Sequence, residues 1–410
     1  MLLSLALVFM CGAALGKIFE KLKLPRLLGM LATGVLLGPQ LLNLLDPKIL
    51  NISPDLRQLA LIIILARAGL NLDIDDLKKV GRPAILLCFV PACLEITGML
   101  IFAPMLLGIS LLEAAIMGTV VAAVSPAVIV PRMLRLMERG YGVKKGIPQM
   151  IMAGASVDDV FVIVLFTAFA GLAQGEALST LQFLTIPSSI ILGLLGGVVT
   201  GIALAAYFQK VHIRDSGKVI IILSIAFLFV SLEQSISGPV GFSGLLAVMA
   251  MGGTLQHYQH IVAKRLSAKF SKLWVAAELI LFVLVGSAVD VAYAFQAGLT
   301  AVLLILIVLV FRLMGVFLSL LGTNLNAKER IFTGLAYLPK ATVQAAIGGL
   351  PLAMGLACGN IVLTVAVLSI IITAPLGASL IDAFYRKLLK NESLLQTEPN
   401  PQKAKPAPKA

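Results

Sequence analysis

Apolar runs long enough to cross a lipid bilayer recur from one end of this chain to the other. A helix needs about 20 apolar residues to span the hydrocarbon core, where only helices and closed barrels satisfy their backbone hydrogen bonds. The 410 residues are 59% hydrophobic and 13% charged, whereas soluble domains are about 25% charged. We therefore predict an all-α polytopic membrane protein in a lipid bilayer, with thirteen spans at about 2–17, 27–45, 54–72, 83–107, 111–134, 147–173, 187–208, 218–234, 239–256, 272–290, 297–322, 330–353 and 361–385.

The basic residues alternate with the predicted loops. A net charge of +12 would suit nucleic acid if the basic residues formed one face with interleaved aromatics. With the N-terminus placed outside, 27 of the 32 Lys and Arg fall in cytoplasmic segments, and only Lys48 and Arg57 fall outside. This positive-inside pattern predicts no nucleic-acid partner and a multi-pass protein of the cell (inner) membrane, with a cytoplasmic C-terminus.

The chain is predicted to form one membrane domain, residues 1–390, followed by a disordered cytoplasmic tail. The tail, 391–410, is rich in Pro, Lys and Ala, a composition that cannot bury a core. The four cysteines have no metal-ligand spacing, and we expect no cofactor.

Two halves of the chain match when one is shifted by 217 residues. The matches are two glycine pairs, an aspartate pair and an acid opposite a base: Gly69 with Gly286, Gly98 with Gly315, Asp73 with Asp290 and Glu95 with Arg312. The shift equals seven spans, an odd number, so the second repeat (about 218–385) should lie inverted relative to the first (about 2–173), with 187–208 as a linking helix. Secondary transporters often place their substrate where such repeats meet.

Prolines near the middle of two matched spans predict interrupted helices. Pro126 follows Ser125 in the fifth span, and Pro339 precedes Lys340 in the twelfth. Proline removes a helical hydrogen bond and clashes with the preceding turn. Interruptions at matching positions indicate a transport site, although two simple proline kinks would leave the same pattern.

Few ionisable residues lie inside the predicted spans: Arg67, Glu95, Asp158, Asp159, Glu278, Arg312 and Lys340. Each costs about 2.5–3.5 kcal/mol at the centre of a membrane helix, so such residues face the protein interior or water and pair with one another. Four acids and three bases leave one acid without a basic partner. We expect Arg67 and Glu278 to form one structural pair.

The segment GASVDDVFVIVLF places Asp158 and Asp159 at the centre of one apolar run. Adjacent helical residues point about 100° apart, so a base can hold one carboxylate while the other lines a water-filled cavity. That second carboxylate can hold a proton or a hard monovalent cation but not both, which is sufficient for an antiporter; a buried ion-pair cluster that only specifies packing is the alternative. We predict a Na⁺ site at Asp159, with further oxygen ligands from Ser156 on the same helix face and from Thr119, Ser125, Thr342 or opened backbone carbonyls.

Four segments resemble a known family. GASVDDVFVIVLF resembles the double-aspartate helix of bacterial and animal sodium/proton antiporters. The segments LARAGLNLD, VVAAVSPAVIVPRML and YLPKATVQAAIG resemble those that mark the NHA-type branch of the cation/proton antiporter superfamily. The resemblance extends from about Gly34 to Pro375.

The resemblance implies a thirteen-helix, NhaA-like fold with two crossed discontinuous helices, an elevator-type cycle and a homodimer. Asp159 matches the ion-binding aspartate, and Asp158 matches the one that pairs with a nearby base. Arg312 stands where strongly electrogenic members have a lysine, and an arginine cannot release its proton at accessible pH. We therefore expect electroneutral exchange of Na⁺ or Li⁺ for H⁺ and an ion pair between Arg312 and Glu95, with Lys340 neutralising either Asp158 or the facing helix ends.

Other function classes fit parts of this pattern. An intramembrane aspartyl protease needs two carboxylates that face each other across a water, whereas adjacent residues of one helix point apart, so we do not expect an enzyme. A sodium-coupled organic-anion symporter can have a similar fold but would want an open amphipathic cavity. A potassium/proton antiporter differs only in the cation. A channel would need a filter repeated around an axis, and the sequence contains no sign of one.

Overall fold

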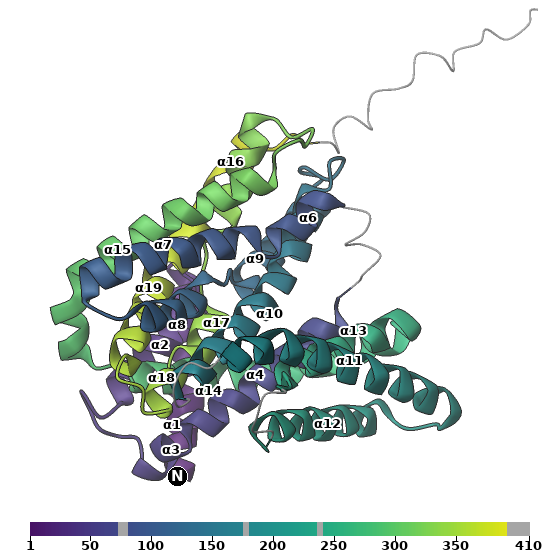
Figure 1. Cartoon of the computed structure of the whole chain (residues 1–410), viewed down its shortest axis with the longest axis horizontal. Helices are drawn as coiled ribbons and strands as arrows, with labels where there is room; N and C mark the ends of the chain where they lie inside the picture. Colours follow the sequence, from purple (N-terminus) through teal and green to yellow (C-terminus); the bar gives the residue numbers. More distant parts are fainter. Residues whose placement is uncertain (73–80, 175–179, 236–240, 392–410) are drawn as a thin grey trace, which may run out of the picture.

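The regular structure of this computed structural model is helical throughout the residues that it describes, 1–72, 81–174, 180–235 and 241–391 (Figure 1). The first half contains α1 (Leu2–Lys21), α2 (Arg26–Leu37), α3 (Pro47–Asn51), α4 (Ser53–Leu70), α6 (Arg82–Leu87), α7 (Val90–Leu107), α8 (Leu111–Ala122), α9 (Pro126–Glu138) and α10 (Ile147–Gln174). The second part contains α11 (Thr180–Lys210), α12 (Asp215–Ser235), α13 (Gly244–Tyr258), α14 (His260–Ser287), α15 (Val291–Ser319), α16 (Ala327–Ala336), α17 (Thr342–Ile347), α18 (Leu350–Ala353) and α19 (Gly359–Leu388).

Every predicted span overlaps one helix or a helix that is interrupted once or twice. Within the described ranges, nine helical segments are long and apolar enough to cross a membrane. The other four predicted spans correspond to helices that are short, more charged or interrupted: α2, α4, α13 and α16–α18. The multi-pass architecture is therefore confirmed, whereas the count of thirteen spans stays a prediction. The predicted disordered tail lies outside the described residues, apart from Asn391.

The order of helices repeats with the shift found in the sequence. Adding 217 to the residue numbers carries α1, α2 and α4 onto α12, α13 and α14, and carries α6–α10 onto α15–α19. Packing follows the same relation, because α2 packs on α14 while α13 packs on α4, and α7 lies alongside its own counterpart α15. Helix α11 lies between the two sets in the sequence, and in space it packs on α13 (Figure 1). The inverted orientation of the second copy stays a prediction.

Glycines allow the two equivalent helix crossings to be close. A Cβ atom at Gly34 of α2 would lie 1.9 Å from the carbonyl oxygen of Val283 in α14, and one at Gly286 would lie 2.2 Å from that of Leu31. At the other crossing, a Cβ atom at Gly69 of α4 would lie 2.4 Å from the carbonyl oxygen of Met249 in α13. Because lipid-embedded helices associate through close packing rather than the hydrophobic effect, these glycines set the contact distance of α2, α4, α13 and α14.

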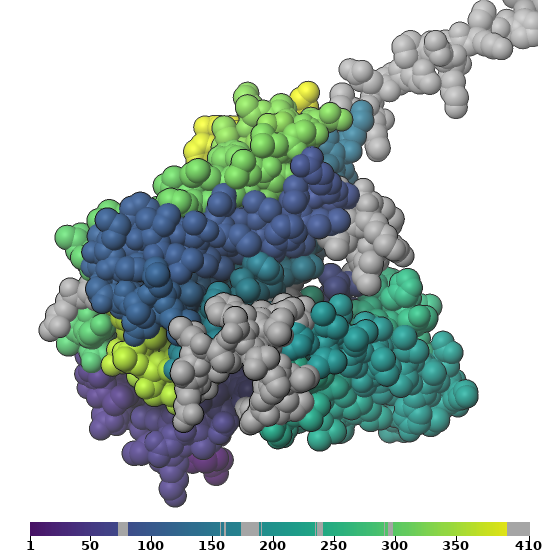
Figure 2. All heavy atoms as spheres, in the orientation of Figure 1, coloured from purple at the N-terminus to yellow at the C-terminus, as the bar shows by residue number. Residues whose placement is uncertain are grey.

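Two regions of the surface can be distinguished by their colours in Figure 2. Figure 2 shows the chain around α6 and α7, in blue, on the upper part of this face, and the teal region of α11–α13 at its lower right. Interior charges lie on α7, α10 and α15; α7 packs on α15 and on α8, and α8 packs on α10. The charged site therefore belongs to the group of helices that contains both interrupted spans.

Candidate functional site

The two interrupted spans meet at their breaks. Helix α8 ends at Ala122 and α9 begins at Pro126, while α16 ends at Ala336 and α17 begins at Thr342. Proline at the first position of α9 is well tolerated because that N–H has no helical acceptor. The amide of Ser125 donates a 2.8 Å hydrogen bond to the carbonyl oxygen of Pro339. The interruptions expected at Pro126 and Pro339 are thus present, and their extended segments contact each other directly.

Equivalent capping boxes begin both broken spans. The side chain of Ser110 accepts from the amide of Glu113 at the start of α8, and the side chain of Asn326 accepts from the amide of Glu329 at the start of α16. In each case the glutamate carboxylate in turn accepts a hydrogen bond from the amide of the capping residue, at 2.8 Å. Caps of this kind satisfy the free donors of a helix start, so both half-helices start at defined positions.

Arg312 of α15 satisfies the carbonyl ends of both half-helices. Its Nε donates to the carbonyl oxygen of Tyr337, just after α16, at 2.7 Å, and its Nη1 donates to that of Ala122, the last residue of α8. The end of a helix carries unsatisfied carbonyls and a partial negative charge, which a cation stabilises. The guanidinium is fully buried, so it fixes the two ends relative to each other in the protein interior.

The same guanidinium pairs with two buried acids from different helices. Arg312 Nη1 lies 2.9 Å from Glu95 Oε2 of α7, and Nη2 lies 2.9 Å from Asp158 Oδ2 of α10. That Asp158 oxygen also accepts from the amide of Val124, at 2.8 Å, in the break before α9. Buried charges are stable only when they are paired and hydrogen-bonded, and this arrangement meets both conditions. The pair expected between Glu95 and Arg312 is present.

Lys340 and Gln344 hold the remaining free carbonyls of the first break. Lys340 Nζ lies 2.6 Å from Glu95 Oε1 and donates to the carbonyl oxygen of Val121 at 2.7 Å. Gln344 Nε2 donates to the carbonyl oxygens of Val121 and Ala123, at 3.1 and 2.8 Å. Of the two roles considered for Lys340, contact with the facing helix end is the one observed. The base that pairs with Asp158 is Arg312, because α15 directs one guanidinium to both acids.

Asp159 stands apart from this network. Its carboxylate is partly buried, and Oδ1 is buried without a hydrogen-bond partner among the described residues. Other buried oxygens without a hydrogen-bond partner among the described residues include Asp158 Oδ1, Ser125 Oγ, Thr342 Oγ1 and Gln344 Oε1. Such orphaned acceptors are rare in folded proteins and call for an explanation such as an ion or water. Oxygen atoms are the ligands that hard cations such as Na⁺ prefer.

The remaining predicted ligands behave differently. Thr119 is fully buried in α8, and its hydroxyl donates to the carbonyl oxygen of Ile116 at 2.8 Å. Its oxygen could still accept, but the hydroxyl is committed to its own helix. Ser156 lies within α10, and its side chain falls outside the described part of the structure.

The predicted structural pair of Arg67 and Glu278 stays a prediction, because the two charges lie within electrostatic range of each other but form no ion pair within 4 Å among the described residues. Both residues are partly buried. Glu278 also lies within electrostatic range of Arg26. The pairing was obtained by elimination among charges inside the spans, and that procedure left out Arg26 at the start of α2.

The sequence reasoning also missed Gln344. It follows the second break by a few residues and is fully buried. A glutamine in an otherwise apolar and small-residue segment, TVQAAIGG, is a signal that could have identified it, because a buried amide needs partners.

Comparison with known proteins places this chain in a family. Residues 5–387 match the family described as Sodium/hydrogen exchanger, transmembrane. The chain is 34% identical over 414 aligned positions to human Sodium/hydrogen exchanger 9B2, covering 95% of this chain and 75% of the relative. It is 30% identical to human Sodium/hydrogen exchanger 9B1, covering 95% and 78%.

A solved structure has the same fold. The sodium proton antiporter MjNhaP1 from Methanocaldococcus jannaschii, determined at pH 8, superposes with a TM-score of 0.82, covering 94% of this chain and 97% of that one at 22% identity. Its likeness supports the fold, and the family match supports the class. The chain therefore belongs to the sodium/hydrogen exchanger family, whose members are transporters and not enzymes.

Proposed function

We propose that this chain exchanges Na⁺ or Li⁺ for H⁺ across a membrane and that Asp159 carries the ion. One observation supports this assignment above all others. Arg312 and Lys340 contribute two positive charges and Glu95 and Asp158 two negative charges to one buried network, so its formal charge sums to zero. Asp159 is the additional carboxylate beside it.

A carboxylate outside a neutral network has two ways to lose its charge in a low-dielectric interior. It binds a proton, or it binds a monovalent cation, and each excludes the other. Antiport follows from this competition, because the site crosses the membrane only when one of the two is bound. The antiport activity carried in the names of the relatives is consistent with this proposal.

The unpartnered oxygens at the breaks are the proposed partners of the cation. Ser125, Thr342 and Gln344 all lie at the interrupted segments and have a buried oxygen without a partner among the described residues. Alkali cations exchange several water ligands for protein oxygens when they bind, so a single carboxylate is insufficient. In this proposal the cation is the substrate, and the network of Arg312 and Lys340 keeps the breaks open for it.

Electroneutral exchange is the stoichiometry that this arrangement favours. The guanidinium of Arg312 keeps its proton at every accessible pH, so it cannot supply a second transported proton. Lys340 is held by Glu95 and by a helix-end carbonyl, both of which stabilise its charged form. One carboxylate then moves one cation in one direction and one proton in the other.

The elevator-type cycle, the homodimer and the membrane orientation belong to the same proposal. The elevator would move the helices that carry the network relative to those built around α2, α4, α13 and α14. The N-terminus would lie outside and the C-terminus in the cytoplasm of the cell membrane, as the distribution of Lys and Arg predicts. Labelling of single cysteines introduced at residues 48 and 269 from either side of the membrane tests the orientation.

The test of the activity uses the full chain in proteoliposomes. Addition of Na⁺ or Li⁺ should dissipate an imposed pH gradient, at a rate that does not respond to a voltage set by potassium and valinomycin. Dissipation by K⁺ alone would make the chain a potassium/proton antiporter, and transport that responds to voltage would refute electroneutrality. A requirement for an organic anion would indicate a symporter.

Asp159→Asn tests the carrier residue. The amide binds neither a proton nor an alkali cation strongly, so exchange should fall to the level of empty liposomes while the protein still folds. Asp382→Asn is the matched control, because that carboxylate pairs with Arg132 at 3.2 Å, is half exposed and lies outside the network. Retained exchange in Asp159→Asn would exclude Asp159 as the carrier.

A further inference from the structure

A second group of buried polar atoms without hydrogen-bond partners among the described residues lies outside the network of Arg312, Glu95, Asp158 and Lys340. Ser53 Oγ and Arg57 Nη1, both in the first turns of α4, have no hydrogen-bond partner among the described residues. They line a cavity of about 240 Å³ whose other walls include the end of α3, the end of α14 and the junction of α17 with α18. Most of these walls are apolar, including Pro39, Leu352 and Leu363.

Arg57 is a buried cation without a counter-ion among the described residues. Its residue is 4% exposed, and its Nε donates a long 3.3 Å hydrogen bond to the carbonyl oxygen of Ser53. The acid nearest in sequence, Asp55, is exposed, and no acid in the described ranges pairs with Arg57. Since an unpaired charge in a protein interior is strongly unfavourable and arginine cannot lose its charge, a negative partner is required.

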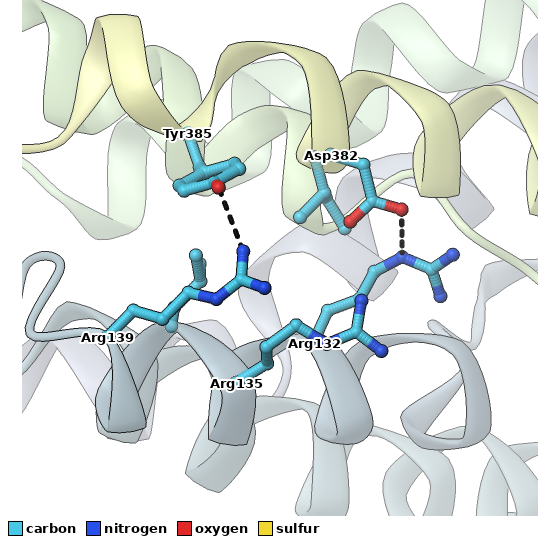
Figure 3. Close-up of a pocket in the computed structure, with 7 residues that line it drawn as sticks. Arg132, Arg135, Arg139, Asp382 and Tyr385 are labelled. Atoms are coloured by element: carbon cyan, nitrogen blue, oxygen red, sulfur yellow. Dashed lines mark hydrogen bonds and ion pairs between the residues drawn. The ribbon is translucent and has the colours of Figure 1, made fainter.

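Three other arginines of the chain have partners for their guanidinium groups. Arg312 is equally buried but has two carboxylates. In the pocket of about 170 Å³ between α9 and α19, Figure 3 shows Arg132 directed at Asp382 and Arg139 at the hydroxyl of Tyr385. Arg57 has neither a carboxylate nor a hydroxyl partner among the described residues, although it is more deeply buried than Arg132 and Arg139.

We propose that the cavity beside Arg57 binds a small monovalent anion, for which chloride is the probe. Arg57 Nη1 and Ser53 Oγ supply two free donors on the same side of the cavity. The start of α4 adds the partial positive charge of a helix N-terminus. One guanidinium balances one negative charge, whereas a dianion such as sulfate would need a second cation. The apolar walls favour an anion that sheds its water easily.

The site adjoins the second interrupted span. A Cβ atom at Gly349, between α17 and α18, would lie 1.9 Å from Arg57 Nη1, so the guanidinium rests directly on that backbone. Helix α17 carries Thr342 and Gln344, two of the residues whose unpartnered oxygens are proposed to bind the cation. A bound anion would therefore fix Arg57 against α17 and α18 and hold this half-helix in place. An effect of the anion on the rate of exchange presupposes the proposed antiport. Binding of the anion does not depend on that proposal.

Binding is tested on the purified full chain in nanodiscs, without any transport measurement. Replacing gluconate by chloride at constant Na⁺ and ionic strength should raise the apparent melting temperature, with an increase that continues as chloride rises above its dissociation constant. Chloride-35 NMR should show line broadening by the protein that bromide reverses. An equal melting temperature in gluconate and chloride, with no broadening, would overturn the proposal.

Variants separate this site from general effects of salt. Arg57→Met should lose the chloride response entirely and be at least as stable as the original chain in gluconate, because it removes the unpaired charge. Ser53→Ala should weaken chloride binding about tenfold, the loss of one hydrogen bond to a charged group. Gly349→Ala should also abolish the response by displacing the guanidinium.

Arg139→Met is the matched control, since that arginine is exposed and lies in the other pocket. It should keep the full chloride response. If Arg57→Met does not fold, Ser53→Ala decides the question, because a chloride affinity unchanged by it would refute the site. A chloride response that survives in Arg57→Met would refute it as well.

Discussion

Replacement of Arg312 by methionine is the strongest single test of the buried network. Methionine is uncharged and shorter, so the change removes the guanidinium and keeps an apolar stem in place of the arginine's methylene groups. Four hydrogen bonds are lost, to Glu95, Asp158, Ala122 and Tyr337. Glu95 keeps Lys340 as a partner at 2.6 Å. Among the described residues, Asp158 keeps its hydrogen bond from the amide of Val124 but loses its ion-pair partner.

The expected cost can be worked from these contacts. Removing one partner of a buried ion pair destabilises a protein by about 3–5 kcal/mol, mainly because the other charge stays buried and unpaired. The double variant Arg312→Met with Asp158→Asn removes that charge too, so it should recover about 2 kcal/mol. Arg312→Lys should fall between the original chain and Arg312→Met, since one ammonium cannot reach acceptors on four segments.

Equilibrium unfolding in mixed micelles of dodecylmaltoside and SDS provides the free energies of unfolding. Arg139→Met is the control, and a partly exposed arginine of this kind should change stability by about 0.5 kcal/mol or less. The reasoning is refuted if Arg312→Met is as stable as this control. It is also refuted if Asp158→Asn adds its own full cost to that of Arg312→Met, because independent sites add and coupled ones do not.

Three further predictions follow from contacts elsewhere in the structure. Gln344→Leu removes the hydrogen bond to the carbonyl of Ala123, so it should lower the free energy of unfolding by about 1–3 kcal/mol and slow Na⁺-driven exchange. Unchanged exchange would show that Gln344 does not position the break. Gly34→Leu should prevent α2 from approaching α14, so size-exclusion chromatography should give aggregate instead of a single peak; a monodisperse protein would contradict the close crossing. Glu278→Gln should change stability by less than about 1 kcal/mol in the same micelle assay, because its carboxylate forms no ion pair within 4 Å among the described residues. A loss of about 3 kcal/mol or more would support a direct pair with Arg67.

The sequence alone was sufficient for the features that depend on local chemistry. Long apolar runs have only one stable form in lipid, so the helical, multi-pass architecture follows from composition and spacing. Pro126 and Pro339 cannot continue a helix, so both breaks were predictable to within a few residues. The shift of 217 residues that placed Glu95 opposite Arg312 also predicted their contact, since equivalent positions of a repeat meet near its axis.

The partners of the buried charges were decided by the tertiary structure. Seven ionisable residues within spans can be paired in many ways, and counting them led to Arg67 with Glu278, which form no ion pair within 4 Å among the described residues. Which groups meet depends on the rotation and depth of each helix, and these are set by packing at places such as Gly98 against Phe311 and Gly315 against Pro91, where α7 lies against α15. Only this packing directs the one guanidinium of Arg312 to Glu95, to Asp158 and to two helix ends, and leaves Asp159 beside a network that is already neutral.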